Sequence, residues 1–456
     1  MGKYRNICST LAWPGLVWVV VGLSGCLGAE ALEPPDEQAG AAVASALSRG
    51  DQGCEPGLGA HLPGIGDDEF ERARTEFARV TTPDDGLGPI FNERSCGNCH
   101  KLPIPGGAGD ETAERFGSFR DDNTFDSLSR EGGPLLHTLT LGEWVNKDGH
   151  TCQVPTEQVP ADATVTTDRL PPALFGVGLL NTIPDSFFDD LAAAEPEAVR
   201  GMVNRVHIAL PDVEDPTQQV GGTRVGRLTW KSATVGVTEF AAAAFRQEVG
   251  ISTQHCVAGQ SITTWATDPA PNAVPVALEC QDNRPGTDFE VGSCAGNRTE
   301  IEPHARQFER YMTFLAPAPR PAWAKLPVVR QGGELFDRVG CSGCHTRRAF
   351  VTPPQPFNGL PGNYEFYPHS DYLLHDVGDL GDHIGQNGET AEKVHLMKTA
   401  PLWGVRLRPK LLHDGRATDV ASAIRWHGGQ AEPAARAFDE LPVGAQLKLL
   451  AYVLSL

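Results

Sequence analysis

Residues 96–100 read Cys-Gly-Asn-Cys-His, and residues 341–345 read Cys-Ser-Gly-Cys-His. Each pentad is a complete attachment site for a c-type haem. Two cysteines three residues apart lie on one face of a short helix, where their thiols can add to the two vinyl groups of one porphyrin, and the adjacent histidine can bind the iron. We therefore predict two covalently bound c haems. Their attachment residues are expected to be Cys96, Cys99, His100, Cys341, Cys344 and His345.

Two other kinds of site use pairs of cysteines at this spacing. A zinc site needs a second pair of ligands about a dozen residues away, and no second Cys-x-x-Cys lies near either pentad. A thioredoxin-like dithiol needs no histidine after its second cysteine. The complete pentads therefore favour haem over zinc or a redox dithiol.

The composition indicates a folded, acidic protein. Its 456 residues are enough for two or three domains, and 40% hydrophobic residues are typical of a globular chain. The formal net charge of -20 argues against nucleic acids and anionic lipid surfaces as partners. It favours a small basic redox protein that donates or accepts electrons.

The first residues resemble an export signal. Lys3 and Arg5 precede an apolar segment, residues 11–22, that is too short for a comfortable membrane span. Residues 23–26, Leu-Ser-Gly-Cys, resemble a bacterial lipobox with Cys26 as the lipidated residue, and an ordinary signal peptide cut near Ala29 is the alternative. We predict a lipoprotein signal peptide at residues 1–26 and a flexible tether at residues 27–66. The protein would be exported to the periplasmic face, with the outer membrane contacted only through the lipid.

The remaining cysteines are expected to form disulfides in part. Of the eleven cysteines, Cys8 lies in the signal, Cys26 in the lipobox and four in the pentads. Five remain, and because five is odd, at least one stays free or pairs with another chain. Export to an oxidising compartment favours disulfides among them, although their spacing does not fix which ones pair. The five are Cys54, Cys152, Cys256, Cys280 and Cys294.

Apolar periodicity predicts a helix before each pentad. Phe70 to Val80 has helical spacing, and residues 332–336 belong to a helix that runs into the second pentad. A parallel layout of helix, short connection and pentad thus occurs twice. Further helices are expected at residues 185–194, 196–208, 238–249, 300–315 and 445–456, and an irregular loop at residues 256–296.

These features predict a mainly α fold with two cytochrome c-like domains. The proline-rich residues 316–321 form a stiff linker that separates a first domain, residues 67–315, from a second domain, residues 326–456. Residues 101–340 lie between the pentads, far more than a small cytochrome needs. The first domain is therefore expected to carry large insertions and irregular loops.

A haem iron has two axial positions, and the pentad histidine fills one of them. An electron carrier fills the other with Met or His, whereas an enzyme leaves it open. For the second haem the candidates are His413, His427 and Met397. The chain has only four methionines, which favours histidine. For the first haem the spacing leaves several candidates open: His137, His150, His207, Glu239 and Glu248.

Several other polar residues are given structural roles. Trp230 and Lys231 form an aromatic and basic pair before a predicted helix. We expect them to serve in packing and in a salt bridge to a haem propionate rather than in a direct role. Four more histidines are expected in loops or at the surface, namely His369, His375, His383 and His395.

Six stretches of the chain carry a family resemblance. They are residues 86–96, 169–180, 367–378, 399–404, 412–417 and 423–431. Through them the chain, from about Phe70 to Leu456, resembles the di-haem oxidoreductases often labelled thiol oxidoreductases, a branch of the bacterial di-haem cytochrome c peroxidase superfamily. The resemblance implies two cytochrome c-like domains that face each other across their haems. One haem would receive electrons, and the other would meet hydrogen peroxide.

The same resemblance bears on the ligands of the second haem. In the peroxidases a methionine binds this haem, in a helix that resembles residues 423–430, and His427 stands at that position here. We therefore expect the second haem to have two histidine ligands. The first is His345, and the other is His427 or else His413. Histidine in place of methionine lowers the reduction potential of the iron.

The expected function is that of a peroxidase-like oxidoreductase. Peroxide, or another small oxidant, would be reduced at the first haem with electrons passed through the second, and Glu239 or Glu248 would move the proton. One alternative is a di-haem electron-transfer lipoprotein without a substrate of its own. Another is a haem-based oxidase that modifies a partner protein. Calcium is a secondary expectation as a further cofactor.

Overall fold

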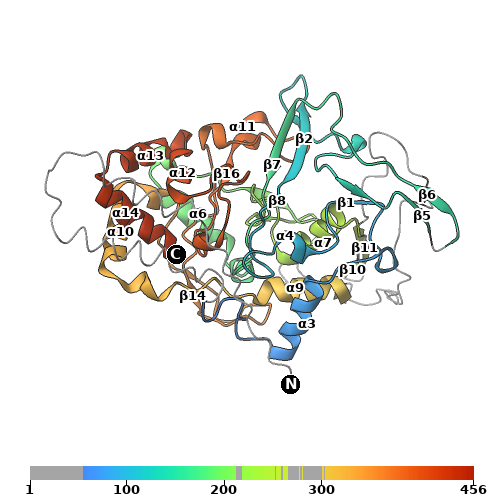
Figure 1. Ribbon diagram of the computed structural model, residues 1–456, viewed down its shortest axis with the longest axis horizontal. Helices are drawn as coiled ribbons and strands as arrows, with labels where there is room; N and C mark the ends of the chain where they lie inside the picture. The colour runs from blue at the N-terminus through green and yellow to red at the C-terminus, as the bar shows by residue number, and fades with distance from the viewer. Residues whose placement is uncertain are drawn as a thin grey trace, which may run out of the picture.

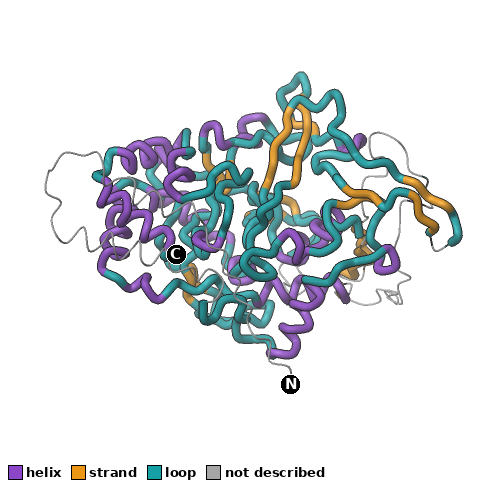
Figure 2. Tube along the Cα trace, viewed as in Figure 1, coloured by secondary structure: helices purple, strands orange, loops and turns teal. Residues whose placement is uncertain are grey.

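The computed structural model describes residues 55–146, 148–211, 218–251, 253–257, 260–264, 277, 280, 300–301 and 303–456. The molecule is elongated, with most C-terminal helices gathered at one end and a long strand hairpin projecting at the other (Figures 1 and 2). Within the described residues, every helix is too short or too polar to cross a bilayer. The predicted signal peptide, Cys26 and most of the predicted tether lie outside these residues.

The helices are short and spread along the chain. Those described are α3 (Asp67–Phe77), α4 (Cys96–Cys99), α5 (Val177–Asn181), α6 (Asp185–Ala194), α7 (Val237–Glu248), α9 (Pro303–Phe314), α10 (Pro327–Arg338), α11 (Ala391–His395), α12 (Val420–Arg425), α13 (Glu432–Asp439) and α14 (Val443–Leu454). The helices predicted before the two pentads are confirmed as α3 and α10, and those predicted near residues 185, 238, 300 and 445 are confirmed as α6, α7, α9 and α14.

Strands are distributed between the helices. The described strands are β1 (Ile90–Phe91), β2 (Ala113–Phe119), β3 (Phe125–Asp126), β4 (Leu139–Thr140), β5 (Glu143–Val145), β6 (Thr151–Gln153), β7 (Val165–Arg169), β8 (Arg205–His207), β9 (Thr223–Val225), β10 (Thr253–Val257), β11 (Gln260–Thr264), β12 (Glu300–Ile301), β13 (Phe350–Val351), β14 (Glu365–Phe366), β15 (Leu374–His375) and β16 (Met397–Lys398). They pair in antiparallel sheets of two or three strands, such as β3-β2-β7.

The predicted fold class is therefore wrong. Short helices alternate with small sheets, and the described residues do not show a mainly α fold made of two cytochrome c-like domains. The strands were missed because segments of two to seven residues, most of them five or fewer, are too short for an alternating pattern to stand out from chance. The helix predicted at residues 196–208 is also wrong, since this segment contains a short 3-10 turn, Glu197–Val199, and strand β8. Likewise, β10 and β11 extend into the predicted irregular loop, most of which lies outside the described residues.

The buried core connects distant parts of the chain. Its main cluster runs from Leu62 and Phe70 through Phe308 to Phe350 and Trp403, so residues on both sides of the predicted linker share one core. A second cluster is made by the C-terminal segment alone, residues 328–456. The described part of the predicted tether, residues 55–66, also packs on the main core through Leu62. The domain bounds at 315 and 326 stay predictions.

A pair of crossed helices supports each pentad. Next to the second pentad, α10 packs so closely on α14 that a Cβ at Gly332 would lie 1.9 Å from the carbonyl oxygen of Lys448. Phe336 and Tyr452 add a ring contact, with centroids 5.3 Å apart. Next to the first pentad, α3 packs on α9 in the same way, with the rings of Phe77 and Tyr311 4.8 Å apart. The layout seen twice in the sequence thus recurs in the packing.

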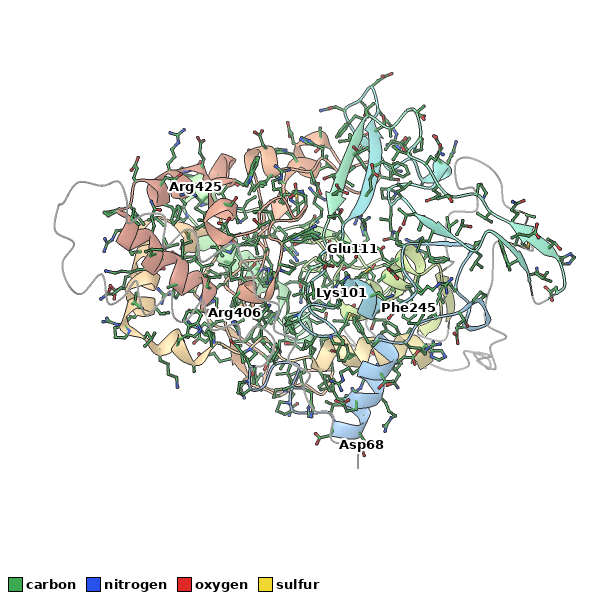
Figure 3. All side chains as sticks on the ribbon, in the orientation of Figure 1. Asp68, Lys101, Glu111, Phe245, Arg406 and Arg425 are labelled. Carbon is green, nitrogen blue, oxygen red and sulfur yellow. A yellow bond between two sulfur atoms is a disulfide. The ribbon has the colours of Figure 1, made fainter. Side chains whose placement is uncertain are left out.

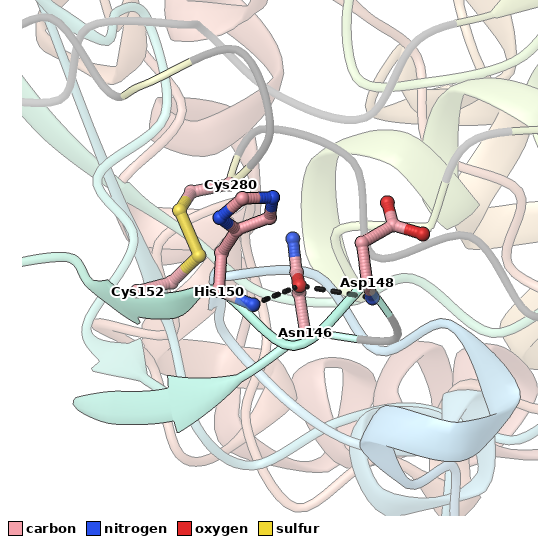
Figure 4. Close-up of a disulfide and its surroundings, with 5 residues drawn as sticks. All are labelled: Asn146, Asp148, His150, Cys152 and Cys280. Carbon is pink, nitrogen blue, oxygen red and sulfur yellow. Dashed lines mark hydrogen bonds between the residues drawn. A yellow bond between two sulfur atoms is a disulfide. The ribbon is translucent and has the colours of Figure 1, made fainter.

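A disulfide joins strand β6 to a segment far along the chain. Cys152 and Cys280 are bonded, with their Cα atoms 5.7 Å apart and a sequence separation of 128 residues (Figure 4). Beside it, the Asn146 side chain accepts hydrogen bonds from the backbone of Asp148 and His150, which closes the turn between β5 and β6. The backbone of Cys256 lies in β10, and Cys8, Cys54 and Cys294 lie outside the described residues.

Candidate functional site

The first pentad forms the short helix α4. The Ser95 hydroxyl accepts a hydrogen bond from the Gly97 backbone at 3.1 Å and so fixes the start of the helix. Cys96 and Cys99 are both free thiols on this one turn. Burial, assisted by the negative charge of Glu248, raises the pKa of Cys99 to about 12, and burial also raises that of Cys96. Both sulfurs therefore carry their protons.

The second pentad forms a 3-10 turn directly after α10. Gly340 adopts a φ of 97°, a left-handed conformation that favours glycine and ends the helix at the pentad. Cys341 and Cys344 are again free thiols, and burial raises the pKa of Cys341 to about 12. All four pentad cysteines are thus reduced and unpaired with each other, as thioether formation requires.

Three histidines share one arrangement. The Nδ1 atom of His100 lies 2.8 Å from the Pro172 carbonyl oxygen, that of His345 lies 3.0 Å from the His369 carbonyl, and that of His427 lies 2.8 Å from the Ala423 carbonyl. A carbonyl only accepts hydrogen bonds, so Nδ1 carries the proton in each ring and Nε2 keeps its lone pair. Histidines that bind metals are usually held in this manner.

Burial keeps these rings in the neutral form that binds metals. It lowers the pKa of His100 and His427, and it lowers that of His345, together with the nearby His427, to about 4. A neutral imidazole with a free Nε2 is the form that an iron ion can bind. The pKa shifts and the hydrogen bonds therefore agree.

A cavity of about 280 Å³ lies next to the second pentad. Cys341, Cys344 and His345 line one side, and His427 lines the other. The centroids of the His345 and His427 rings lie 6.4 Å apart. In protein sites a metal lies about 2.0–2.1 Å from each imidazole nitrogen, so two rings at this separation leave room for one iron between their Nε2 atoms. The residues present thus fit a haem held by two histidines.

His413 lines the same cavity without facing His345. Its ring meets Trp230 edge-on, with centroids 6.2 Å apart, and burial lowers its pKa to about 4. Met397 also lines the cavity and is buried. Of the ligand candidates proposed from the sequence, His427 has its ring 6.4 Å from that of His345, whereas the ring contact of His413 is with Trp230.

Trp230 and Lys231 are tied to the protein frame. The Trp230 indole donates a hydrogen bond to the Leu170 carbonyl at 2.8 Å. The buried Lys231 amine lies 2.7 Å from Asp382 and also donates to the carbonyls of Val394 and Leu396. This amine therefore has an ion-pair partner within the chain, in contrast to the haem propionate expected from the sequence.

The two candidate acids occupy different places. Glu248 lies beside the first pentad, accepts a hydrogen bond from the Asn92 amide at 3.1 Å and lies 3.7 Å from Arg115. Glu239 accepts hydrogen bonds from the backbone of Ala209 and Val235 and so anchors the start of α7. Burial raises the pKa of Glu239. Of these two acids, Glu248 is the one whose charge acts on the thiols of the first pentad.

The other distal candidates lie elsewhere. His137 is buried, with its ring nitrogens 2.7 Å from Glu157 and 2.7 Å from the Gln247 carbonyl, so neither nitrogen is free for a metal. His150 and His207 are exposed. Of the histidines expected in loops, His369 and His375 are buried next to the second pentad. These two histidines, along with Asp371 and Arg115, were not predicted from the sequence as site residues.

The two pentads lie in different parts of the molecule. Lys101 and Glu111, which follow the first pentad, lie near the middle, and Arg425, two residues before His427, lies at the helical end (Figure 3). Residues 170–173 connect them, because Pro172 bonds to His100 while Leu170 lines the cavity of the second pentad. Two separate sites are therefore joined by one segment.

Comparisons with known proteins give a family for this chain. The family model described as "Di-haem oxidoreductase, putative peroxidase" matches residues 152–456, which include the second pentad but not the first. No curated protein matches the chain. A solved structure of hydrazine synthase from Kuenenia stuttgartiensis, pressurised with xenon, aligns over 100% of both chains with 12% identity and a TM-score of 0.37, too low to support an argument. Because the family model matches more than half of this chain, the chain belongs to the di-haem oxidoreductase family and is a haem-dependent oxidoreductase.

Proposed function

We propose that the protein is an exported c-type di-haem oxidoreductase that reduces peroxide. The observation that carries this proposal is the shared arrangement of His100, His345 and His427, each with Nδ1 bonded to a carbonyl and Nε2 free for iron. The membership of the di-haem oxidoreductase family supports the same chemistry. A haem at each pentad supplies the iron that takes up and releases electrons.

Covalent attachment is supported by the state of the cysteines. Each pentad presents two free thiols next to a histidine that has an available Nε2. A thioether bond forms when a thiol adds across a vinyl group, so a disulfide within either pentad would prevent it. The chain is therefore prepared for two c haems, one held by Cys96 and Cys99 and one by Cys341 and Cys344.

The second site is suited to electron transfer. His345 and His427 would hold the haem of this site between them, and a haem held by two histidines would pass electrons rather than bind a substrate. From this cavity, His413 contacts Trp230, Trp230 bonds to Leu170, and the neighbouring Pro172 bonds to His100 at the first pentad. These contacts give a continuous protein connection along which electrons can pass from the second site to the first.

The first site is suited to proton transfer. Glu248 lies beside the pentad, and a guanidinium nitrogen of Arg115 lies 3.7 Å from the Glu248 carboxylate. A carboxylate and a buried cation would thus both lie next to a peroxide bound at this site. The Glu248 carboxylate would take a proton from one peroxide oxygen and deliver it to the other as the O–O bond breaks. Arg115 would stabilise the negative charge that develops, because its buried Nε has no hydrogen-bond partner among the described residues.

Export and partners follow from the sequence. The lipobox-like residues 23–26 support lipidation at Cys26, and haem attachment outside the cytoplasm agrees with export. The net charge of -20 supports a small basic redox protein as the electron donor. The protein would then work on the periplasmic side of a membrane to which only its lipid binds.

Peroxide turnover with an artificial electron donor tests this function. Glu248→Gln should lower kcat about 10²–10⁴-fold, the usual contribution of a general acid–base group, with the haem content unchanged. Glu239→Gln, on the same helix, is the matched control and should keep turnover within about twofold. Full activity in Glu248→Gln would remove this residue from the mechanism. Absence of turnover in the wild-type protein, with both haems present, would favour the electron-carrier alternative.

A further inference from the structure

Cys344, His375 and Asp371 form a row of three polar side chains behind the second pentad. The Sγ atom of Cys344 lies 3.6 Å from Nδ1 of His375, and Nε2 of His375 lies 3.0 Å from a carboxylate oxygen of Asp371. His375 is 2% exposed and Asp371 is 0% exposed, so water does not separate them. A thiol, an imidazole and a carboxylate in this order are the parts of an activated cysteine.

The hydrogen bonds fix how the His375 ring is oriented. A carboxylate only accepts hydrogen bonds, so the Nε2 atom of His375 carries the proton and donates it to Asp371. The Nδ1 atom faces the Cys344 thiol. Burial opposes a charge on this ring, but the hydrogen bonds to Asp371 and Cys344 outweigh it and raise the pKa of His375 to about 11, so the ring has a high affinity for a proton. His375 is therefore placed to accept the thiol proton rather than to donate one.

The backbone holds this row rigidly against the pentad. The backbone amide of Asp371 donates to the Cys344 carbonyl at 3.1 Å, and a carboxylate oxygen of Asp371 accepts from the Leu373 amide at 2.8 Å. Behind the ring, a Cβ at Gly201 would lie 2.6 Å from Nε2 of His375, so only a glycine fits there. The position of His375 is therefore fixed before any haem is bound.

The first pentad differs at the corresponding cysteine. The charged groups that act on Cys99 are Glu248, Glu93, Glu111 and Lys101, and among the described residues no histidine side chain contacts its sulfur. In both pentads burial disfavours the thiolate. Among the pentad cysteines, which all lie in the described part of the chain, Cys344 is the one with a histidine nitrogen at its sulfur, so the first pentad is an internal reference.

We propose that Asp371 and His375 assist the covalent attachment of haem at Cys344. The inference rests on the proposed c-type attachment. As the bond forms, the S–H bond of Cys344 breaks, Nδ1 of His375 takes the proton, and the sulfur bonds to one carbon of the haem vinyl group. The proton then passes to the other vinyl carbon. No electron is gained or lost overall, and the His375–Asp371 pair returns to its starting state.

The pair is thus a built-in catalyst for the maturation of one thioether bond. His375 acts as the base, and Asp371 holds the imidazole in the required tautomer. Asp371→Asn would reverse that tautomer, because an amide that donates to Nε2 leaves the proton on Nδ1, directed at the sulfur. Cys341, the first cysteine of the same pentad, would form its bond without this help.

Mass spectrometry of peptides from the exported full chain tests the proposal. The protein is made in a short expression pulse in a host that attaches c haems, free thiols are alkylated, and the bond at each cysteine is quantified. His375→Gln and Asp371→Asn should lower thioether formation at Cys344 at least tenfold, with Cys96, Cys99 and Cys341 unchanged. Cys344→Ser provides the single-thioether standard for the haem spectrum.

A matched control removes a similar contact nearby. His395 lies 3.1 Å from Asp376 in the same part of the chain and does not contact a pentad cysteine. His395→Gln should leave all four bonds intact. An intact first haem and Cys152–Cys280 disulfide in His375→Gln show that this variant has folded, so a loss at Cys344 is then specific.

The outcomes separate this proposal from the proposed function. If Cys344 is joined to haem as fast in His375→Gln and in Asp371→Asn as in the wild type, the catalytic role is overturned and covalent attachment stands. If the wild-type protein carries no covalent haem at either pentad, the proposed function itself fails. Equal losses at Cys344 and at Cys99 would also overturn the proposal, because His375 touches only the first of these.

Discussion

The imidazole rings of His345 and His427 face each other across one cavity, with their centroids 6.4 Å apart. His345 is the last residue of the second pentad, and His427 lies just after helix α12, more than eighty residues along the chain. Both donate Nδ1–H to a backbone carbonyl, so both direct Nε2 at the space between them. This relationship underlies the assignment of a second haem with two histidine ligands.

His427→Ala should convert the second haem from a low-spin to a high-spin or solvent-bound state. The reason is that the substitution removes the ring opposite His345 and opens an axial position. Electron paramagnetic resonance of the oxidised protein would show the loss of one low-spin signal. His413→Ala is the control and should keep that signal. A low-spin signal that survives His427→Ala and disappears in His413→Ala would assign the ligand to His413.

Replacing Cys96 and Cys99 together with serine should lower the covalent haem content from two per chain to one. Serine hydroxyls do not add to vinyl groups under the conditions in which thiols do, so the first pentad would lose its bonds. A pyridine haemochrome assay per mole of purified protein measures this content. Two covalent haems in the double variant would show that the first pentad is not an attachment site.

Cys26→Ser should move the protein from the membrane fraction to the soluble exported fraction. Without its thiol the lipobox-like segment has no residue to carry the lipid. Fractionation of cells with an antibody against the chain is the measurement. If the distribution does not change, an ordinary signal peptide or a retained apolar segment would explain the localisation instead.

Gly332→Ala should lower the free energy of unfolding by at least about 1–3 kcal/mol, the usual cost of overpacking. Its Cβ would lie 1.9 Å from the Lys448 carbonyl oxygen and would push α10 and α14 apart. Gly66→Ala is the control, because nothing lies within 4 Å of a Cβ at that position. Chemical denaturation of the two variants compares them. Equal stability would mean that the two helices can separate without cost.

The sequence contains the two pentads, predicted most of the helices and offered His427 as a candidate ligand of the second haem. These features depend on local spacing, such as the apolar period of α10 and the positions within each pentad. The strands depend on contacts with distant segments. For example, β1 and β4 are two residues each and pair only because the chain brings them together. No local pattern marks such segments, so the mainly α fold class was wrong.

The site residues that the sequence missed are those defined by three-dimensional contact. His369 was expected in a loop or at the surface; it lies in a loop but is buried, and its backbone, at a φ of 52°, presents the carbonyl that holds His345. His375 follows Asp371 by four residues, a spacing that is not distinctive by itself. Glu239 and Glu248 have the same status in sequence, and only the fold shows that Glu248 is the one beside a pentad.

The most direct test of the account is ligand binding to the protein with only one haem reduced. Cyanide and peroxide should each bind to the iron at the first pentad, because His427 would occupy the second iron in the proposed arrangement. The absorption spectrum should then report one new species per chain. The same addition to the variant lacking Cys96 and Cys99 should give no such species. If both irons stay six-coordinate in every redox state and cyanide binds neither, the account of a peroxide-reducing enzyme is contradicted and an electron carrier takes its place.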